Sequence, residues 1–197
     1  MKKSLAAASV CALLIAAPAW AQNSCNRAAP GAENLNQQDR TFVEKAGGGS
    51  LAESDLGKLA EQKGATPAVR EFGRWMATDH GLVANNWLKA ILGDQNQRFQ
   101  PMLTAQDKEL RQKLDGLRGA QFDREYIQSQ VVDHEKTIPV FQREASDGHN
   151  PMIKNFAENM IPVLQQHLAE AKALAGGAGV AAGESNAERS GSSMPPR

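Results

Sequence analysis

The feature that most constrains this chain is a helical stripe of apolar residues that contains a histidine. The stretch runs from Val69 to Trp87, and His80 lies four residues after Met76 and three before Val83. The apolar side chains of the stripe recur at helical spacing: Phe72, Met76, Val83 and Trp87. Residues spaced by three and four positions share one face of an α-helix. The stretch therefore predicts a helix that turns a histidine toward the protein interior.

Three further segments have the same periodicity, and each carries one polar residue in its apolar row. The first begins near Asn36, and its inward row reads Phe42, Ala46, Gly49, Glu53, Leu56 and Ala60. The third extends from about Gly119 to Ser146, with the row Ile127, Val131, His134, Ile138 and Phe141. The fourth begins after Asn150, with the row Ile153, Phe156, Met160, Val163, His167, Ala171 and Leu174. We expect four long helices that meet along these rows.

Helix-start signals mark where these segments begin. Asn36 and Asp39 form a capping-box pattern, and Thr104 with Asp107 repeats it before a short amphipathic segment. Thr66-Pro67 and Asn150-Pro151 each combine an N-cap residue with a proline at the first helical position. The residues that follow these two caps also match at equal spacing: Val69 with Ile153, Phe72 with Phe156, and Met76 with Met160. The match indicates two related helical hairpins.

The connection between the two hairpins is longer than a tight turn needs. The second helix is expected to end near Leu92, and the polar stretch from Gly93 to Pro101 precedes the short helix at Thr104. The sequence therefore predicts an all-α fold at residues 35–175: a four-helix bundle in which a long crossover, containing a short helix, joins helices 2 and 3.

Three glycines at positions 47–49 weaken the first helix, and they permit either a close backbone approach or a kink.

Both ends of the chain are predicted to lie outside this bundle. Residues 1–21 have the lysines, short apolar run and small-residue ending of an export signal, with cleavage expected after Ala21. Residues 22–34 and 176–197 have little to bury and are expected to be disordered. The mature protein is then periplasmic or secreted, and it keeps one cysteine, Cys25, which we interpret as an inert thiol, a lipidation site or a link between chains.

Composition argues against several classes of partner. Without Lys2 and Lys3, the chain has 20 basic and 22 acidic residues, and no basic stripe suited to a phosphate backbone. Aromatic residues are too sparse to stack nucleic-acid bases, so nucleic acid is not an expected partner. No transmembrane segment is expected, because the apolar run of the signal is too short to span a bilayer and nothing later in the chain resembles a membrane helix. A monomer or a weak oligomer is expected.

Four polar residues on four buried rows form a candidate metal site: Glu53, His80, His134 and His167. They lie near the middle of their helices, so they fall at about the same level of a bundle. Buried imidazole and carboxylate groups are costly unless they are paired or coordinated. Three imidazoles and a carboxylate suit zinc, iron, manganese or copper. The alternative is a metal-free polar network in which Glu53 accepts hydrogen bonds from the imidazoles.

Neighbours of these four residues are candidates for supporting roles. Asp79 and Asp133 each precede a candidate ligand and are expected to orient it or to lie at the surface. Met76 lies one turn before His80, and its thioether is a possible copper ligand. We nevertheless expect Met76 to fill the core. His149 lies in a loop and is expected at the surface.

Three pieces of the sequence resemble one known family of exported bacterial proteins. They are AGGGSLAESDLGKLAEQKGATPAVREFGRWMATDH, GAQFDREYIQSQVVDHE and NMIPVLQQHL, within about residues 36–174. The resemblance is to domain of unknown function 4142, of the ferritin-like superfamily, which implies a four-helix bundle with a crossover and no established activity. Ferritin-like di-iron proteins carry a Glu three residues before the metal-binding His on two helices. Here these positions hold Ala77 and Leu164, so a di-iron centre is not expected.

Three functions remain open at this point. The first is a bundle that binds one transition metal for metal handling or stress protection, without catalysis. The second is a small redox enzyme whose metal has an open position for peroxide or oxygen. The third is a metal-free structural or interaction module. The sequence contains no nucleophile elbow, phosphate loop, dinucleotide fingerprint or C-x-x-C pair that would favour another chemistry.

Overall fold

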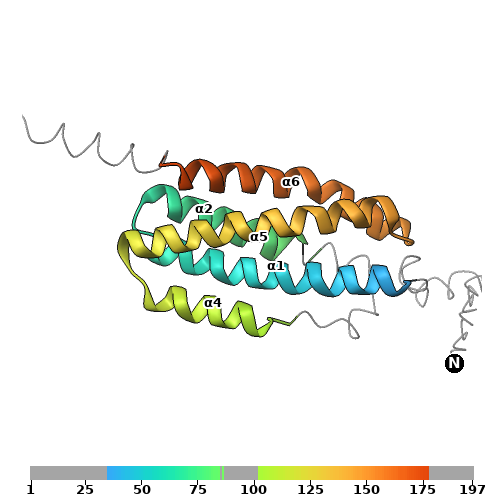
Figure 1. The fold of residues 1–197 in the computed structure, drawn as a ribbon, viewed down its shortest axis with the longest axis horizontal. Coiled ribbons are helices and arrows are strands. Elements are labelled where there is room, and N and C mark those ends of the chain that lie inside the picture. Colours follow the sequence, from blue (N-terminus) through green and yellow to red (C-terminus); the bar gives the residue numbers. More distant parts are fainter. Residues whose placement is uncertain (1–34, 85, 87–101, 178–197) are drawn as a thin grey trace, which may run out of the picture.

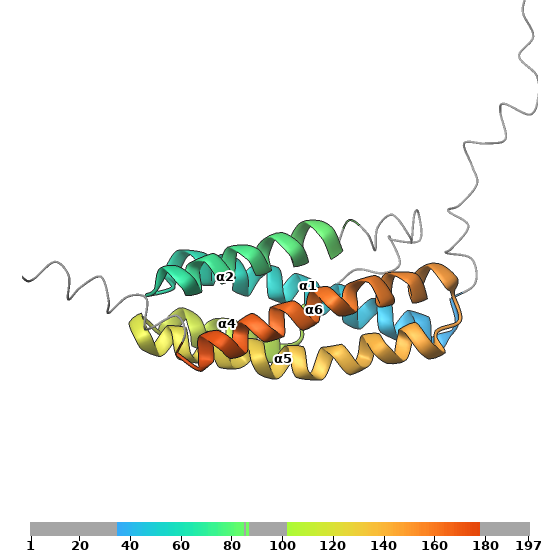
Figure 2. The ribbon, with the colours of Figure 1, turned by 90° about the horizontal axis from the view of Figure 1, so that it is seen from above.

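Two helical hairpins lie side by side in the computed structural model, which describes residues 35–84, 86 and 102–177. The first hairpin consists of α1 (Gln37–Lys63) and α2 (Pro67–Thr78), which continues as a π-helical segment, η2 (Asp79–Ala84). The second consists of α5 (Gly119–Asp147) and α6 (Pro151–Ala175). Helix α4 (Ala105–Gly116) packs against α1 and α5 (Figures 1 and 2). The described residues contain no strand, so the all-α prediction is confirmed.

Several predictions concern residues that the structure does not describe. These are the export signal, the lead-in with Cys25, the connection from Gly93 to Pro101 and most of the tail. Within the described residues, no helix has both the length and the apolar character needed to cross a membrane.

The predicted helix starts are confirmed. Asn36 and Asp39 form a complete capping box on α1, and Thr104 and Asp107 form one on α4. Thr66 caps α2 by accepting a hydrogen bond from the backbone N–H of Val69. Asn150 caps α6 in the same way, accepting from the backbone N–H groups of Met152 and Ile153. Local capping chemistry thus sets where the helices begin.

The second helix differs from its prediction in its last turns. An uninterrupted α-helix to about Leu92 was expected, but the α-helix ends at Thr78 and residues 79–84 form a π-helix. A π-helical turn holds one more residue than an α-helical turn, so it changes the direction of the side chains that it carries. His80 lies within this segment, whereas the side chains of Val83 and Trp87 are outside the described part of the chain.

Two buried aspartates tie each hairpin to the loop of the other. Asp39 of α1 accepts hydrogen bonds from the backbone N–H groups of His149 and Asn150, in the α5–α6 loop. Asp123 of α5 accepts from the N–H groups of Ala65 and Thr66, in the α1–α2 loop. The two aspartates are 84 positions apart, as are the two capping residues Thr66 and Asn150. The internal repeat therefore includes both the capping residues and the aspartates that accept hydrogen bonds from their backbone N–H groups.

The two helices of the first hairpin meet through glycines. A Cβ atom built on Gly57 would lie 2.6 Å from the backbone nitrogen of Ala77, and one on Gly73 would lie 2.7 Å from the carbonyl oxygen of Gly57. Only glycine fits at such distances from another backbone. Among residues 47–49, a Cβ on Gly48 would lie 3.0 Å from the carbonyl oxygen of Met102. Of the two alternatives for these glycines, a close backbone approach or a kink, the structure thus shows the close approach at Gly48.

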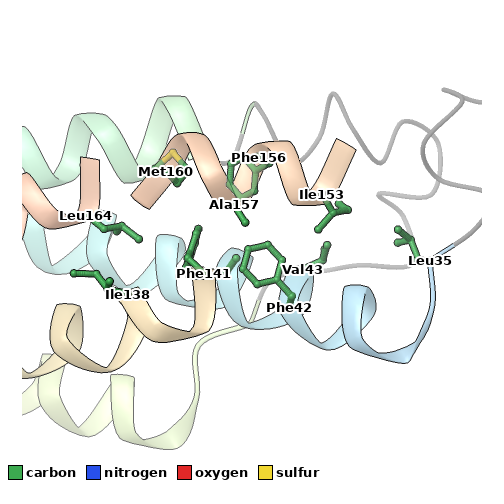
Figure 3. Packing of buried hydrophobic residues seen from close by; sticks show 11 residues of the cluster. Leu35, Phe42, Val43, Ile138, Phe141, Ile153, Phe156, Ala157, Met160 and Leu164 are labelled. Carbon is green, nitrogen blue, oxygen red and sulfur yellow. The ribbon is translucent and has the colours of Figure 1, made fainter. Parts of the chain in front are cut away.

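The apolar core is divided into two clusters along the bundle. One cluster, shown in Figure 3, joins the first half of α1 to the end of α5 and the start of α6, through residues such as Phe42, Phe141 and Phe156. The other joins the second half of α1 to α2, α4 and the start of α5, through residues such as Phe72, Leu114 and Tyr126. The predicted rows supply most of this core.

Four members of the predicted rows are less buried than expected. Gly49 was expected to face inward, but it is exposed, and Ser50 is buried in its place. Val131, Val163 and Leu174 are half-buried, and Leu164 beside Val163 is fully buried. The buried face of each of these helices is therefore rotated slightly about the helix axis, relative to the face that regular spacing alone predicts.

The glycine contact makes a prediction about stability. Gly73→Ala is expected to lower the free energy of unfolding by about 1–3 kcal/mol, because its methyl group would overlap the backbone of α1. Gly49→Ala is the matched control, since a Cβ there meets nothing within 4 Å. It is expected to raise the free energy of unfolding by up to about 1 kcal/mol through helix propensity. Denaturant unfolding of both variants checks this, and equal effects would contradict the close packing.

Candidate metal centre

A layer of polar side chains separates the two apolar clusters in the middle of the bundle. Along α1, α5 and α6, the polar residue lies between members of the two clusters, as His134 lies between Ile127 and Ile138, and His80 follows the α2 residues of the second cluster. Solvent-accessible fractions in the layer are 5% for Glu53, 5% for His80, 1% for His134 and 0% for His167. All four predicted residues are therefore buried, one each on α1, η2, α5 and α6.

The three histidines face one another. Their ring centroids are 5.9 Å apart for His80 and His134, 5.3 Å for His80 and His167, and 5.5 Å for His134 and His167. One ring nitrogen from each can be chosen so that all three lie within 4.8 Å of one another. Nitrogen ligands about 2 Å from a shared ion are separated by distances below this limit, so the rings are close enough to share one.

In two of these rings, a hydrogen bond at one nitrogen determines which nitrogen keeps a lone pair for a metal. His134 Nδ1 lies 2.9 Å from the carbonyl oxygen of Gln130, one turn earlier in α5. A carbonyl oxygen only accepts, so Nδ1 carries the proton and Nε2 of the neutral ring has a free lone pair. His167 Nε2 likewise donates to the carboxylate of Asp79 at 3.0 Å, which leaves the lone pair on Nδ1. Metal-binding histidines are commonly held by such bonds to their second nitrogen.

The nitrogens left over have no hydrogen-bond partner among the described residues. These atoms are His134 Nε2, His167 Nδ1 and both ring nitrogens of His80. An unsatisfied buried polar atom costs about 1–3 kcal/mol, so several in one layer need an explanation. Protein interiors satisfy such atoms with bound water, ions or metals.

The surroundings keep all three imidazoles neutral. Burial lowers the pKa of His80 well below its ordinary value, and the neighbouring His167 and His134 lower it further. Burial likewise lowers the pKa of His134, with a further contribution from His167. For His167, burial lowers the pKa although the bond to Asp79 opposes it. Neutral imidazole is the form that coordinates a metal.

Glu53 lies beside this group rather than within it. Its carboxylate groups with Asp133 and His134, whose ligand atoms lie within 4.8 Å of one another. Burial, and then the nearby Asp133, raises the pKa of Glu53 well above its ordinary value. The structure thus brings Glu53 to His134 but groups it with Asp133, which is exposed, and not with His80 or His167.

The supporting residues are partly those expected from the sequence. Asp79 orients a histidine, but that histidine is His167 on α6 and not its neighbour His80. The same carboxylate oxygen also accepts from the indole N–H of Trp75 at 2.8 Å. Met76 is completely buried and belongs to the apolar cluster of α2. His149 is exposed, as predicted.

Two polar residues on α5 were not identified from the sequence. Gln130 is fully buried, and neither atom of its side-chain amide has a hydrogen-bond partner among the described residues. The hydroxyl of Tyr126, one turn earlier, is also buried without a partner. Both residues precede His134 by multiples of four positions, which was the available signal. Their polar atoms extend the layer toward the second apolar cluster.

A cavity of about 180 Å³ connects this layer to the protein surface. Glu53, His80 and His134 form its inner wall, whereas His167 does not line it. Its outer rim lies between α1 and α5, where it is bounded by exposed residues that include Lys45, Gly49, Asp133, Lys136 and Val140. The histidine group is therefore approachable from one side.

The lowered histidine pKa values make stability depend on pH. Because the unfolded chain binds protons near pH 6.5 and the buried rings do not, acidification below that value favours unfolding. Each such group contributes up to about 1.4 kcal/mol per pH unit. We expect the midpoint of thermal unfolding, measured in chelator, to fall between pH 7.5 and pH 5.5. The His80→Gln variant should lose less stability over that range, and an equal loss would contradict the assignment.

Comparison with known proteins identifies the family. The sequence model of a family described as Domain of unknown function (DUF4142) matches residues 25–174. No curated protein showed a significant match to the chain. No solved structure did so either. The match covers most of the chain and contains the whole polar layer, and the chain therefore belongs to the DUF4142 family.

Proposed function

We propose that this protein is an exported ferritin-like bundle that holds one transition metal ion in its core. His80, His134 and His167 are the proposed nitrogen ligands, and Glu53 is the carboxylate beside them. The proposed role is metal handling or stress protection rather than turnover. The single observation that carries this proposal is that three buried imidazoles converge with unpartnered nitrogens.

The orientation of the rings supports a metal more than a hydrogen-bonded network. In a network, the imidazoles would donate to one another or to Glu53. Instead, His134 and His167 donate away from the group, to Gln130 and Asp79. Each ring thereby keeps one lone pair that neither acceptor uses, and lone pairs on neighbouring rings repel one another unless a cation or a donor lies between them.

The same geometry supports one ion rather than two. His134 belongs both to the three-histidine group and to the group with Glu53 and Asp133. With Nδ1 committed to Gln130, His134 has one nitrogen to offer, so the two groups compete for it. The absence of carboxylates at Ala77 and Leu164 agrees with this reading, because a di-iron centre uses acidic residues there. Zinc, iron, manganese and copper all suit the proposed ligands.

Metal content tests the proposal directly. The full-length chain is expected to copurify with, or take up, about one equivalent of a transition metal. At a free metal concentration about 100 times the dissociation constant, binding should stabilise the fold by about 2.7 kcal/mol. The His134→Ala variant should lose both effects, whereas His149→Ala, in an exposed loop, should keep them. Elemental analysis and thermal unfolding with and without chelator measure this, and a wild-type chain without stoichiometric metal or metal-induced stabilisation would overturn the proposal.

Export is tested separately. When the full chain is expressed with its own N-terminus in a Gram-negative bacterium, we expect the mature protein to begin at Gln22 and to be recovered from the periplasm. Intact-mass measurement of the periplasmic and cytoplasmic fractions checks the cleavage position. A full-length mass confined to the cytoplasm would contradict export and would leave the metal proposal unaffected.

A further inference from the structure

We propose that the cavity between α1 and α5 is a binding site for a small monovalent anion, which becomes the exogenous ligand of the core metal. The inference rests on the proposed metal site and goes beyond it, because it assigns a ligand class and a route of access. The chemical class is that of azide, cyanate or hydroperoxide: a few atoms, one negative charge and one end able to coordinate.

The lining of the cavity supplies the first argument. His80 and His134 form part of its inner wall, and His167 lies outside it. An ion held by the three rings would therefore have histidine on the closed side and the cavity on the other. Protein sites with three fixed ligands and one open position are those that accept a further molecule.

Charge supplies the second argument. Imidazole coordinates a metal in its neutral form, so three histidine ligands leave the charge of a divalent ion uncompensated. Glu53, the nearest buried carboxyl group, belongs with Asp133 and His134 instead of with all three histidines. Two lysines, Lys45 on α1 and Lys136 on α5, lie at the exposed rim of the cavity, and among the described lining residues Asp133 is the one exposed carboxylate there. An anion would be attracted at the mouth by the lysines and inside by the metal.

Size supplies the third argument. A volume of about 180 Å³ holds a few small molecules, but not a nucleotide or a peptide. Gly49 keeps the rim open, because a Cβ at this position would meet no atom within 4 Å. Val140 lines the cavity from the opposite helix, and its side chain is 36% exposed. These two positions offer independent ways to fill the cavity, and neither is a proposed ligand.

Azide binding to the protein loaded with cobalt(II) tests the inference. Cobalt(II) is the probe because its visible spectrum changes with its ligands. We expect azide to produce a saturable spectral change with one site per metal. Gly49→Trp and Val140→Trp are each expected to weaken azide binding by about tenfold or more while cobalt content stays at the wild-type level. Gly116→Trp is the matched control, since Gly116 also meets open space but lies on α4 away from the cavity.

The rim lysines are tested in the same assay. Lys45→Gln combined with Lys136→Gln is expected to weaken azide binding by about two- to fivefold, the effect of one or two exposed charges. The difference should shrink at high ionic strength, because salt screens exposed charges. An unchanged azide affinity in this double variant would overturn the charge argument.

The outcomes separate this inference from the proposal on which it rests. Cobalt uptake without any response to azide would overturn the anion site and leave the metal site standing. An azide response that is equal in the wild type and in both tryptophan variants would overturn the cavity as the route. No cobalt uptake in the wild type would overturn the metal site and the anion site together.

Discussion

The central constraint on this structure is the burial of three imidazole rings in one layer of the core. Each ring gives up contact with water, and a helical bundle offers few backbone groups in its middle to replace those hydrogen bonds, because most are already paired within the helices. Two rings are satisfied on one side only, by the carbonyl of Gln130 and the carboxylate of Asp79. The stability of the layer therefore depends on what occupies the space between the remaining nitrogens. The two apolar clusters on either side hold the helices in position around it.

Placement of His80 depends on details of the first hairpin. Gly57 and Gly73 allow α1 and α2 to approach until backbone meets backbone, which leaves little room for side chains between them. The chain then changes from α-helix to π-helix at Asp79, immediately before His80. Single π-helical turns recur at functional sites because they redirect one side chain without breaking the helix. Asp79, in the same turn, reaches His167 on another helix, so one turn contributes both a candidate ligand and the partner of a second.

Sequence reasoning predicted the features that depend on local chemistry. The helix starts at Asn36, Thr66, Thr104 and Asn150 follow from side-chain caps, and the buried layer follows from polar residues at helical spacing. The features that it missed depend on how helices are rotated against one another. The pairing of Asp79 with His167, the burial of Gln130 and the exposure of Gly49 all require knowledge of the neighbouring helix. The π-helical turn was also missed, because periodicity alone favours a regular helix through His80.

The two buried aspartates have a consequence for how the chain folds. Asp39 of the first hairpin accepts hydrogen bonds from backbone N–H groups in the loop of the second hairpin. Asp123 of the second hairpin does the same for the loop of the first. In an isolated hairpin, the N–H groups of the loop would therefore lack their carboxylate acceptor, because that acceptor belongs to the other half. Repeated halves often fold as semi-independent units, but here the repeat is interlocked. Such reciprocity makes folding cooperative across the whole bundle, so that His80 from one half meets His134 and His167 from the other only in the fully assembled state.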